Sequence, residues 1–354
     1  MSIMRKQTQS LLRGGALALA LVTFEPAVLF ADEGGVSFWL PGLFGSLAAV
    51  PQPTPGWSLL TFTYYTNVSA GADVAAAREV QIGRFNPTLT TNLSANLHAQ
   101  VGLQWVQPNY AFATPVLGGQ LTMGIGGLFG RSSADLAGTL TTTLGPLVSV
   151  RSENVSSAVT GFGDLYPVAM LKWHNGVHNY MVYATGDIPV GAYDPNRLAN
   201  LSIGHGAADG GGGYTYLDPK AGHEFTAVTG LTYNFKNVDT GYQNGIDWHL
   251  DWGASKYLSK QLFVGAVGYF YQQLTADSGQ APVLGEFKSR VIGIGPQLGY
   301  LFPVGDMQGY LNLKSYYEFA AENRPSGWNA WVTFVISPAE KPTPSATAKP
   351  MVYK

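Results

Sequence analysis

The stretch DWHLDWG, residues 247–253, decides which fold class the chain can adopt. Asp247, His249 and Asp251 occupy every second position, and the positions between them hold tryptophan or leucine. Successive side chains of a β-strand point to opposite faces, so the stretch predicts a strand with one polar and one apolar face. Such a strand separates a polar environment from an apolar one.

The same period of two recurs along the chain, in residues 120–126, 224–235, 292–301 and 310–319. The apolar faces end in tryptophan and tyrosine, which gather at the two surfaces of a membrane. A soluble β-sandwich would alternate too and remains the alternative. The aromatic ends favour strands that cross a membrane as a closed barrel, because no open sheet edge is tolerated in lipid.

The expected connections alternate between short and long, as in outer-membrane barrels. Short turns are expected at 114–119, 174–179, 218–223, 258–261 and 302–309, and long loops near 132–157, 188–211, 236–245, 275–289 and 320–326. The fold class is therefore all-β: a transmembrane antiparallel β-barrel of about 12 strands with an N-terminal luminal segment. Fourteen strands are the alternative, because residues 76–92 fit either an extension of the second strand or a further hairpin. The expected strands are 57–67, 93–112, 118–131, 158–172, 178–188, 212–219, 223–236, 245–257, 261–274, 286–301, 309–319 and 327–337.

The composition of the 354-residue chain excludes several classes of protein. The net charge of −2 gives no basic face for nucleic acid. The absence of cysteine excludes disulfides, thiolate metal sites and cysteine nucleophiles. Only 12% of the residues are charged, yet no window reads as a spanning helix. The apolar residues must instead be distributed among polar ones.

The N-terminus predicts export. The apolar run of residues 14–24 follows three basic residues, Arg5, Lys6 and Arg13. Ala31 is a small residue suited to the position before a signal-peptidase cleavage site. This is the pattern of a signal peptide, with an uncleaved anchor as the alternative. The predicted location is the bacterial outer membrane. The predicted division is a signal peptide (1–31), an apolar plug-like segment (32–56), the barrel (57–337) and a flexible Pro-rich tail (338–354).

The plug-like segment contains SFWLPGLFGSLAAV, residues 37–50, which carries no charge. A spanning helix needs ~20 apolar residues, so the segment is too short to cross a membrane. We expect it to fold into the barrel lumen as a constriction; the alternatives are packing against the periplasmic rim or binding a partner. The plug candidates are Phe38, Trp39, Leu40, Leu43 and Phe44.

Polar residues on the strands are interpreted as the lining of the lumen. Neighbours on one face of a strand lie about 6.5–7 Å apart, so Asp247, His249 and Asp251 line a wall more readily than they build a catalytic or metal site. Lys314 and Glu318 are expected to be paired wall charges. The histidines show no metal-ligand spacing, and GHGAADGGGG, 204–213, reads as an outside loop because it lacks the end of a phosphate-binding motif. The lumen-lining candidates are Asp164, Glu224, Asp247, His249, Asp251, Asn312, Lys314 and Glu318; no metal or other cofactor is expected.

Five motifs together resemble a known family. They are SFWLPGLFGSLAAVPQPTPG (37–56), GFGDLYP (161–167), GYQNGIDWHLDWGASKYL (241–258), VIGIGPQLGYLFP (291–303) and YYEFAAENRPSGWNAWVTF (316–334). In this order they resemble the outer-membrane proteins named for the meta-pathway of phenol degradation. The resemblance implies a transporter of aromatic or other hydrophobic compounds.

The expected function is passive diffusion of hydrophobic, including aromatic, small molecules through an outer-membrane channel. The expected partners are outer-membrane lipid and the hydrophobic solute, without nucleic acid; the oligomeric state stays open. The alternatives are an outer-membrane lipid-modifying enzyme and a structural surface barrel. We expect no enzymatic activity, because no Ser/His pair with convincing local context is found.

Overall fold

The computed structural model describes residues 37–71, 91–144, 147–279 and 288–340. The predicted signal peptide, most of the ambiguous stretch 76–92 and the tail beyond residue 340 lie outside these ranges. In the described parts of the chain, no helix has the length and apolar character needed to cross a membrane.

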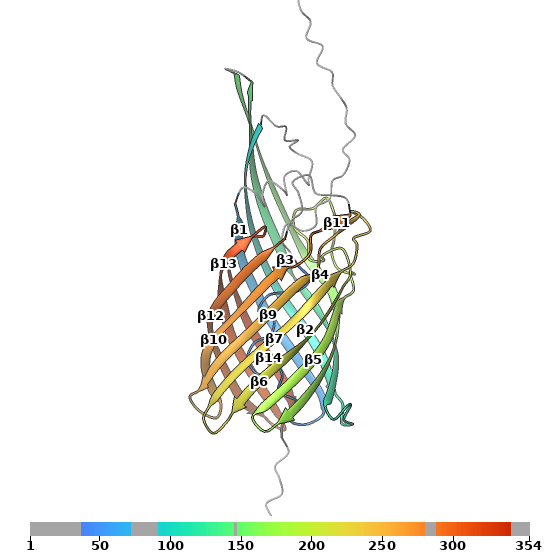
Figure 1. Ribbon diagram of the computed structural model, residues 1–354, viewed down its shortest axis with the longest axis vertical. Coiled ribbons are helices and arrows are strands. Elements are labelled where there is room, and N and C mark those ends of the chain that lie inside the picture. Colours follow the sequence, from blue (N-terminus) through green and yellow to red (C-terminus); the bar gives the residue numbers. More distant parts are fainter. Residues whose placement is uncertain (1–36, 72–90, 145–146, 280–287, 341–354) are drawn as a thin grey trace, which may run out of the picture.

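Twelve of the described strands pair antiparallel into one closed barrel, in which β1 closes onto β14 (Figure 1). This confirms the predicted fold class. β8 and β11 form a separate two-stranded sheet outside the barrel order. The strands are β1 (Gly56–Ala70), β2 (Thr91–Ala111), β3 (Gln120–Leu144), β4 (Leu147–Asn175), β5 (His178–Asp187), β6 (Ala207–Asp218), β7 (His223–Asn234), β8 (Tyr242–Gln243), β9 (Asp247–Tyr257), β10 (Leu262–Gln273), β11 (Ser278–Gly279), β12 (Arg290–Val304), β13 (Met307–Glu322) and β14 (Ser326–Pro338).

Two predicted loops are wrong: residues 204–213 overlap β6, and residues 132–157 belong to a hairpin. Residues 132–157 were expected to form a long outside loop, but β3 and β4 stay paired through this region as far as Leu144 and Leu147. The long hairpin rises well beyond the rest of the barrel (Figure 1). Its sequence is rich in threonine, serine and valine, and β-branched residues favour a strand wherever a partner strand is present. Polarity alone therefore did not identify a loop here.

The two faces of the wall differ as the alternation predicts. On β7 the inward residues Glu224 and Thr226 are 3% and 0% exposed, whereas the outward Phe225 and Leu231 are 44% and 50% exposed. An apolar exterior around a closed set of backbone hydrogen bonds is what a lipid bilayer requires. The short turns and both ends of the barrel, the start of β1 and the end of β14, lie at one end (Figure 1). In outer-membrane barrels that end faces the periplasm.

Candidate functional site

Residues 37–50, here called the luminal segment, lie inside the barrel. Trp39 and Ala49 are 2% and 0% exposed, and the polar partners of the segment are inward-facing side chains of the strands. The segment has no strand partner, so its backbone polar groups need other partners. The remaining plug candidates, Phe38, Leu40, Leu43 and Phe44, are half-buried and pack against the apolar cluster of the interior.

Two buried wall charges hold the first turn of the segment. The Asp251 carboxylate accepts from the backbone N–H of Gly42 at 2.8 Å and of Phe44 at 3.0 Å. The Lys314 Nζ donates to the carbonyl oxygens of Gly42 at 2.5 Å and of Leu43 at 3.2 Å. Hydrogen bonds to ionised groups are stronger than neutral ones, so this pair fixes the turn firmly.

Gly42 is needed at this turn. Its φ is +86°, and a Cβ there would lie 2.9 Å from the Tyr316 ring. Only glycine adopts this conformation without a steric penalty and also leaves room for the ring. The glycine thus allows the backbone to approach β13 closely enough for Lys314 to reach it.

A second carboxylate holds the middle of the segment. Glu224 accepts from the Ser46 hydroxyl at 2.6 Å and from the Leu47 N–H at 3.1 Å. Ser46 also lies 2.9 Å from the Ser255 hydroxyl and accepts from Gln297 Nε2 at 2.7 Å. Asn312 in turn holds the Gln297 side chain by donating to its Oε1 at 3.3 Å.

The segment leaves towards the short-turn end through contacts that the sequence did not reveal. Thr215 Oγ1 accepts from the Ala49 N–H at 3.2 Å, and Lys172 Nζ donates to the Val50 carbonyl at 3.3 Å. Gln120 binds the backbone of Gln52 with both its oxygen and its nitrogen. Gln120 and Lys172 are register partners on β3 and β4, so only the strand pairing brings these two polar residues together.

The anchors of residues 42–49 are confined to one side of the barrel. Between Gly42 and Ala49, the hydrogen bonds seen among the described residues join the segment to β6, β7, β9, β12 and β13. These strands lie next to one another in the barrel, with only β10 among them. We call the anchoring side chains the polar half-wall: Thr215, Glu224, Thr226, Asp251, Ser255, Gln297, Lys314 and Tyr316.

The opposite side of the interior presents aromatic rings. Phe62 stacks on Trp105 at 5.2 Å between ring centroids and meets Trp331 at 5.0 Å. Trp105 in turn contacts Tyr166 at 4.8 Å, and Trp331 contacts Tyr64 at 4.6 Å. These five residues, on β1, β2, β4 and β14, form a continuous ladder that we call the aromatic half-wall.

The ladder crosses β3 because that strand has a glycine at the crossing. A Cβ on Gly126 would lie 2.1 Å from the Trp105 ring, so any side chain there would displace the indole. The luminal segment meets this half-wall through Phe38, whose ring lies 5.9 Å from that of Tyr166. The contact is apolar and contains no hydrogen bond among those described.

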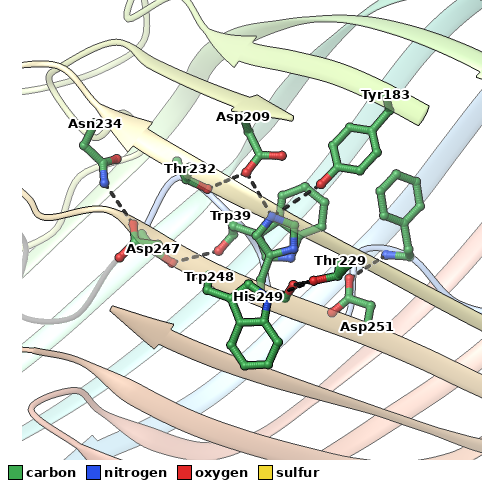
Figure 2. A network of polar contacts seen from close by, with 12 residues as sticks. Trp39, Tyr183, Asp209, Thr229, Thr232, Asn234, Asp247, Trp248, His249 and Asp251 are labelled. Carbon is green, nitrogen blue, oxygen red and sulfur yellow. Dashed lines mark hydrogen bonds and ion pairs between the residues drawn. The ribbon is translucent and has the colours of Figure 1, made fainter. Parts of the chain in front are cut away.

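His249 and Trp39 form a third contact, on the wall next to the polar half-wall. The two rings stack at 3.7 Å between centroids and 11° between planes. His249 Nε2 lies 2.9 Å from Asp209 Oδ2, which also accepts from Thr232 (Figure 2). Asp209 was not among the predicted lumen residues, because it lies in a glycine-rich stretch that read as a loop; the structure has β6 beginning at Ala207.

Asp247, two residues before His249, accepts from Asn234 Nδ2 at 2.9 Å (Figure 2). Asp247 and Asp251 are thus separated by the stacked His249, and each carboxylate serves a different neighbour. The alternating acids of β9 are brought onto one inward face but not into one cluster.

The expected pair of Lys314 and Glu318 is not formed. Lys314 reaches the luminal segment, and its Nζ also lies 4.8 Å from the centre of the Trp331 ring. Glu318 accepts instead from the Tyr269 hydroxyl at 2.6 Å and from the Gly327 N–H at 3.0 Å. The sequence alternation correctly placed both charges on one face of β13. In the fold, however, each of them binds residues of other segments instead of the other charge.

Asp164 is fully buried and holds a connection rather than lining an open wall. Its carboxylate accepts from the N–H groups of Gly191 at 2.8 Å and Ile203 at 3.2 Å. Both belong to residues 188–206, between β5 and β6, which were expected to be a long outside loop. Leu198, Ala199 and Leu201 of that connection are buried, so it folds inward against the wall.

The site shows no sign of a metal centre in the described residues: they contain no group of three or more histidine or acidic side chains placed to share an ion. The interior is built to hold a segment of its own chain on one side and to present aromatic rings on the other. These are features of binding and passage.

A closed barrel with an apolar exterior defines an outer-membrane β-barrel, and this one holds a segment of its own chain in the lumen. The fold is similar to that of an outer membrane channel from Pseudomonas putida F1, with a TM-score of 0.61, 12% identity and coverage of 82% of this chain and 98% of that one. A FadL homologue from Pseudomonas aeruginosa (TM-score 0.38, 10% identity, 83% and 94% covered) and the translocator domain of the autotransporter NalP from Neisseria meningitidis (TM-score 0.35, 9% identity, 80% and 89% covered) are more distant. No curated protein matches the chain.

The family described as "Putative MetA-pathway of phenol degradation" matches residues 82–334. The chain belongs to this family, as the five motifs of its sequence indicate. Its location is the bacterial outer membrane.

Proposed function

We propose that the protein is a passive outer-membrane channel for hydrophobic small molecules, including aromatic ones. The observation that carries the proposal is the division of the interior: the wall charges bind the backbone of the luminal segment, and the aromatic half-wall faces the segment through apolar contacts only. A wet pore would leave its wall charges in contact with water. Here Asp251 and Lys314 are 1% and 5% exposed, so an apolar solute meets few free charges.

The family and the fold support the same proposal. The family description names a pathway that degrades phenol, and the similar protein of known structure is titled an outer membrane channel. Sites for apolar ligands are lined mainly by hydrophobic and aromatic side chains, with few polar groups. The ladder of five aromatic residues has that composition.

An enzymatic role is less well supported. His249 and Asp209 resemble two members of a hydrolytic triad, but the other hydrogen-bonding side chains of the pair are Tyr183 and Thr232 (Figure 2). His249 is also 0% exposed beneath Trp39, where a lipid ester could not reach it. We therefore propose transport without turnover or cofactor, with membrane lipid and the solute as partners.

Deletion of residues 37–50 tests the proposal. The strand pairing begins at Gly56, so the barrel should still assemble and keep a heat-modifiable mobility on gels. In planar bilayers its single-channel conductance should rise several-fold over the wild type, because the anchoring charges would then face water. Cells with intact lipopolysaccharide should take up naphthalene faster with the wild type than with an empty vector. Unchanged conductance in a folded deletion variant, together with no naphthalene uptake by the wild type, would contradict the proposal.

A further inference from the structure

The luminal segment packs against buried side chains of the interior, so a solute that passes it must displace some of these contacts. We propose that the solute passes between the luminal segment and the aromatic half-wall while the segment stays bound to the polar half-wall, and that the aromatic rings favour flat aromatic solutes over saturated ones of the same size. This inference rests on the proposed function and adds its route and its selectivity.

Movement on the polar side would be costly. It would remove the two N–H donors from Asp251 and the two carbonyl acceptors from Lys314, leaving both charges buried without these partners. Glu224 would lose Ser46 and Leu47 as well. A buried charge that loses its partner is among the most unfavourable changes in a protein, so the segment should stay attached on this side.

On the aromatic side, movement at the Phe38 end breaks a ring contact and leaves in place the hydrogen bond from Lys172 to the Val50 carbonyl at the other end of the segment. The ring contact of Phe38 with Tyr166 is apolar, and a hydrophobic solute placed between the two rings replaces the contacts it breaks. The backbone anchors begin at Gly42, four residues after Phe38, so this end can shift without releasing Asp251. The cheapest opening is therefore on the side of the rings.

The geometry of the ladder supports selectivity for aromatic solutes. Its rings already meet one another at 4.6–5.2 Å between centroids, in stacked and tilted pairs. Aromatic rings attract each other in these arrangements beyond simple burial of apolar area, whereas a saturated ring gains only the burial. Rings on four strands offer such a solute successive contacts of the same kind.

Paired cysteines can lock either side, and the chain has no native cysteine to interfere. Ser46→Cys/Ser255→Cys ties the segment to the polar half-wall, where the two hydroxyls lie 2.9 Å apart. Phe38→Cys/Tyr166→Cys, joined by a reducible bis-methanethiosulfonate reagent that spans the room left by the two rings, ties it to the aromatic half-wall. Disulfide formation is followed by counting free thiols, and gel mobility checks folding. Leu47→Cys/Thr226→Cys is a second polar-side pair, because the Leu47 N lies 3.1 Å from Thr226 Oγ1.

Uptake of radiolabelled naphthalene is measured in cells with intact lipopolysaccharide, before and after oxidation or cross-linking. Oxidised polar-side pairs should keep uptake within about twofold of their reduced forms. The cross-linked Phe38/Tyr166 pair should fall to the empty-vector rate and recover on reduction of the cross-link. The opposite result, or a block by both kinds of lock, would overturn the route. If neither the wild type nor any reduced variant exceeds the vector, the proposed function itself fails.

Selectivity is tested with decalin, which has the ten carbons of naphthalene without the aromatic rings. The wild type should take up naphthalene several-fold faster than decalin, and Phe62→Leu should lower naphthalene uptake more than decalin uptake and so bring the two rates together. Equal rates in the wild type would overturn the selectivity and leave the route to be judged by the cysteine locks.

Discussion

The polar and aromatic half-walls belong to one barrel and follow the same alternation, yet they treat the luminal segment differently. On one side, Asp251, Glu224 and Lys314 bind its backbone. On the other, the Tyr166 ring meets Phe38, and Lys172 binds the segment at its Val50 end. Buried charges fix whatever satisfies them, because leaving them unpaired is unfavourable. Aromatic rings accept one apolar partner in place of another. The difference shows how one wall can hold a segment in place and still leave a replaceable surface.

The segment itself explains why the charges are on the wall. It lies outside the sheet, so its N–H and carbonyl groups have no strand partners. A segment with its own charges would need further charges in the interior. An uncharged segment bound by wall residues keeps the number of buried ions low.

The largest effect is expected from removing the central anchor. Asp251→Ala leaves the Gly42 and Phe44 N–H groups without acceptors and removes a carboxylate that stabilises the Lys314 charge, so unfolding in urea should show a loss of about 3–5 kcal/mol. Asp218→Ala is the matched control, because Asp218 also accepts from two backbone N–H groups but in an exposed turn. The control should lose far less. Equal losses would show that burial of the charge does not matter.

An intermediate effect is expected from crowding the aromatic half-wall. Gly126→Ala places a Cβ against the Trp105 ring, and overpacking of this kind should reduce the free energy of unfolding by about 1–3 kcal/mol. It should also slow naphthalene uptake. Gly127→Ala is the control, since the added Cβ would meet only Leu165 at 3.3 Å. If both variants take up naphthalene at the wild-type rate, the ladder does not contribute to passage.

The smallest effect is expected from Tyr316→Phe. It removes one long hydrogen bond, 3.4 Å from the Tyr316 hydroxyl to the Gly42 carbonyl, which Lys314 still satisfies. The loss should be about 0.5–1 kcal/mol in the same urea titration. The corresponding change on the other half-wall, Tyr166→Phe, should leave the binding of the segment unchanged. A loss of several kcal/mol on Tyr316→Phe would mean that Lys314 alone does not hold the turn.

Sequence reasoning worked best where the period of two was strong. The inward positions of Glu224, Asp251 and Asn312 followed from alternation alone, because a strand that faces lipid on one side has only one other side for polar groups. Sequence reasoning worked least well where a polar or glycine-rich stretch was interpreted as a loop. The hairpin beyond residue 131 and the start of β6 are polar or glycine-rich, but neighbouring strands supply the pairing that makes them strands.

The sequence by itself determined the barrel, its approximate number of strands, its family and the uncharged character of residues 37–50, whereas the structure decided between twelve and fourteen strands. These depend on local patterns, and a local pattern is sufficient where one environment is lipid. Only the tertiary structure decided that Lys314 binds Gly42 and not Glu318, and that Lys172 and Asp209 belong to the lumen. It also decided that the anchors lie on one side and the rings on the other. The physical reason is that these contacts join residues far apart in the chain, and only the closed barrel with the segment folded inside it brings them within hydrogen-bonding distance.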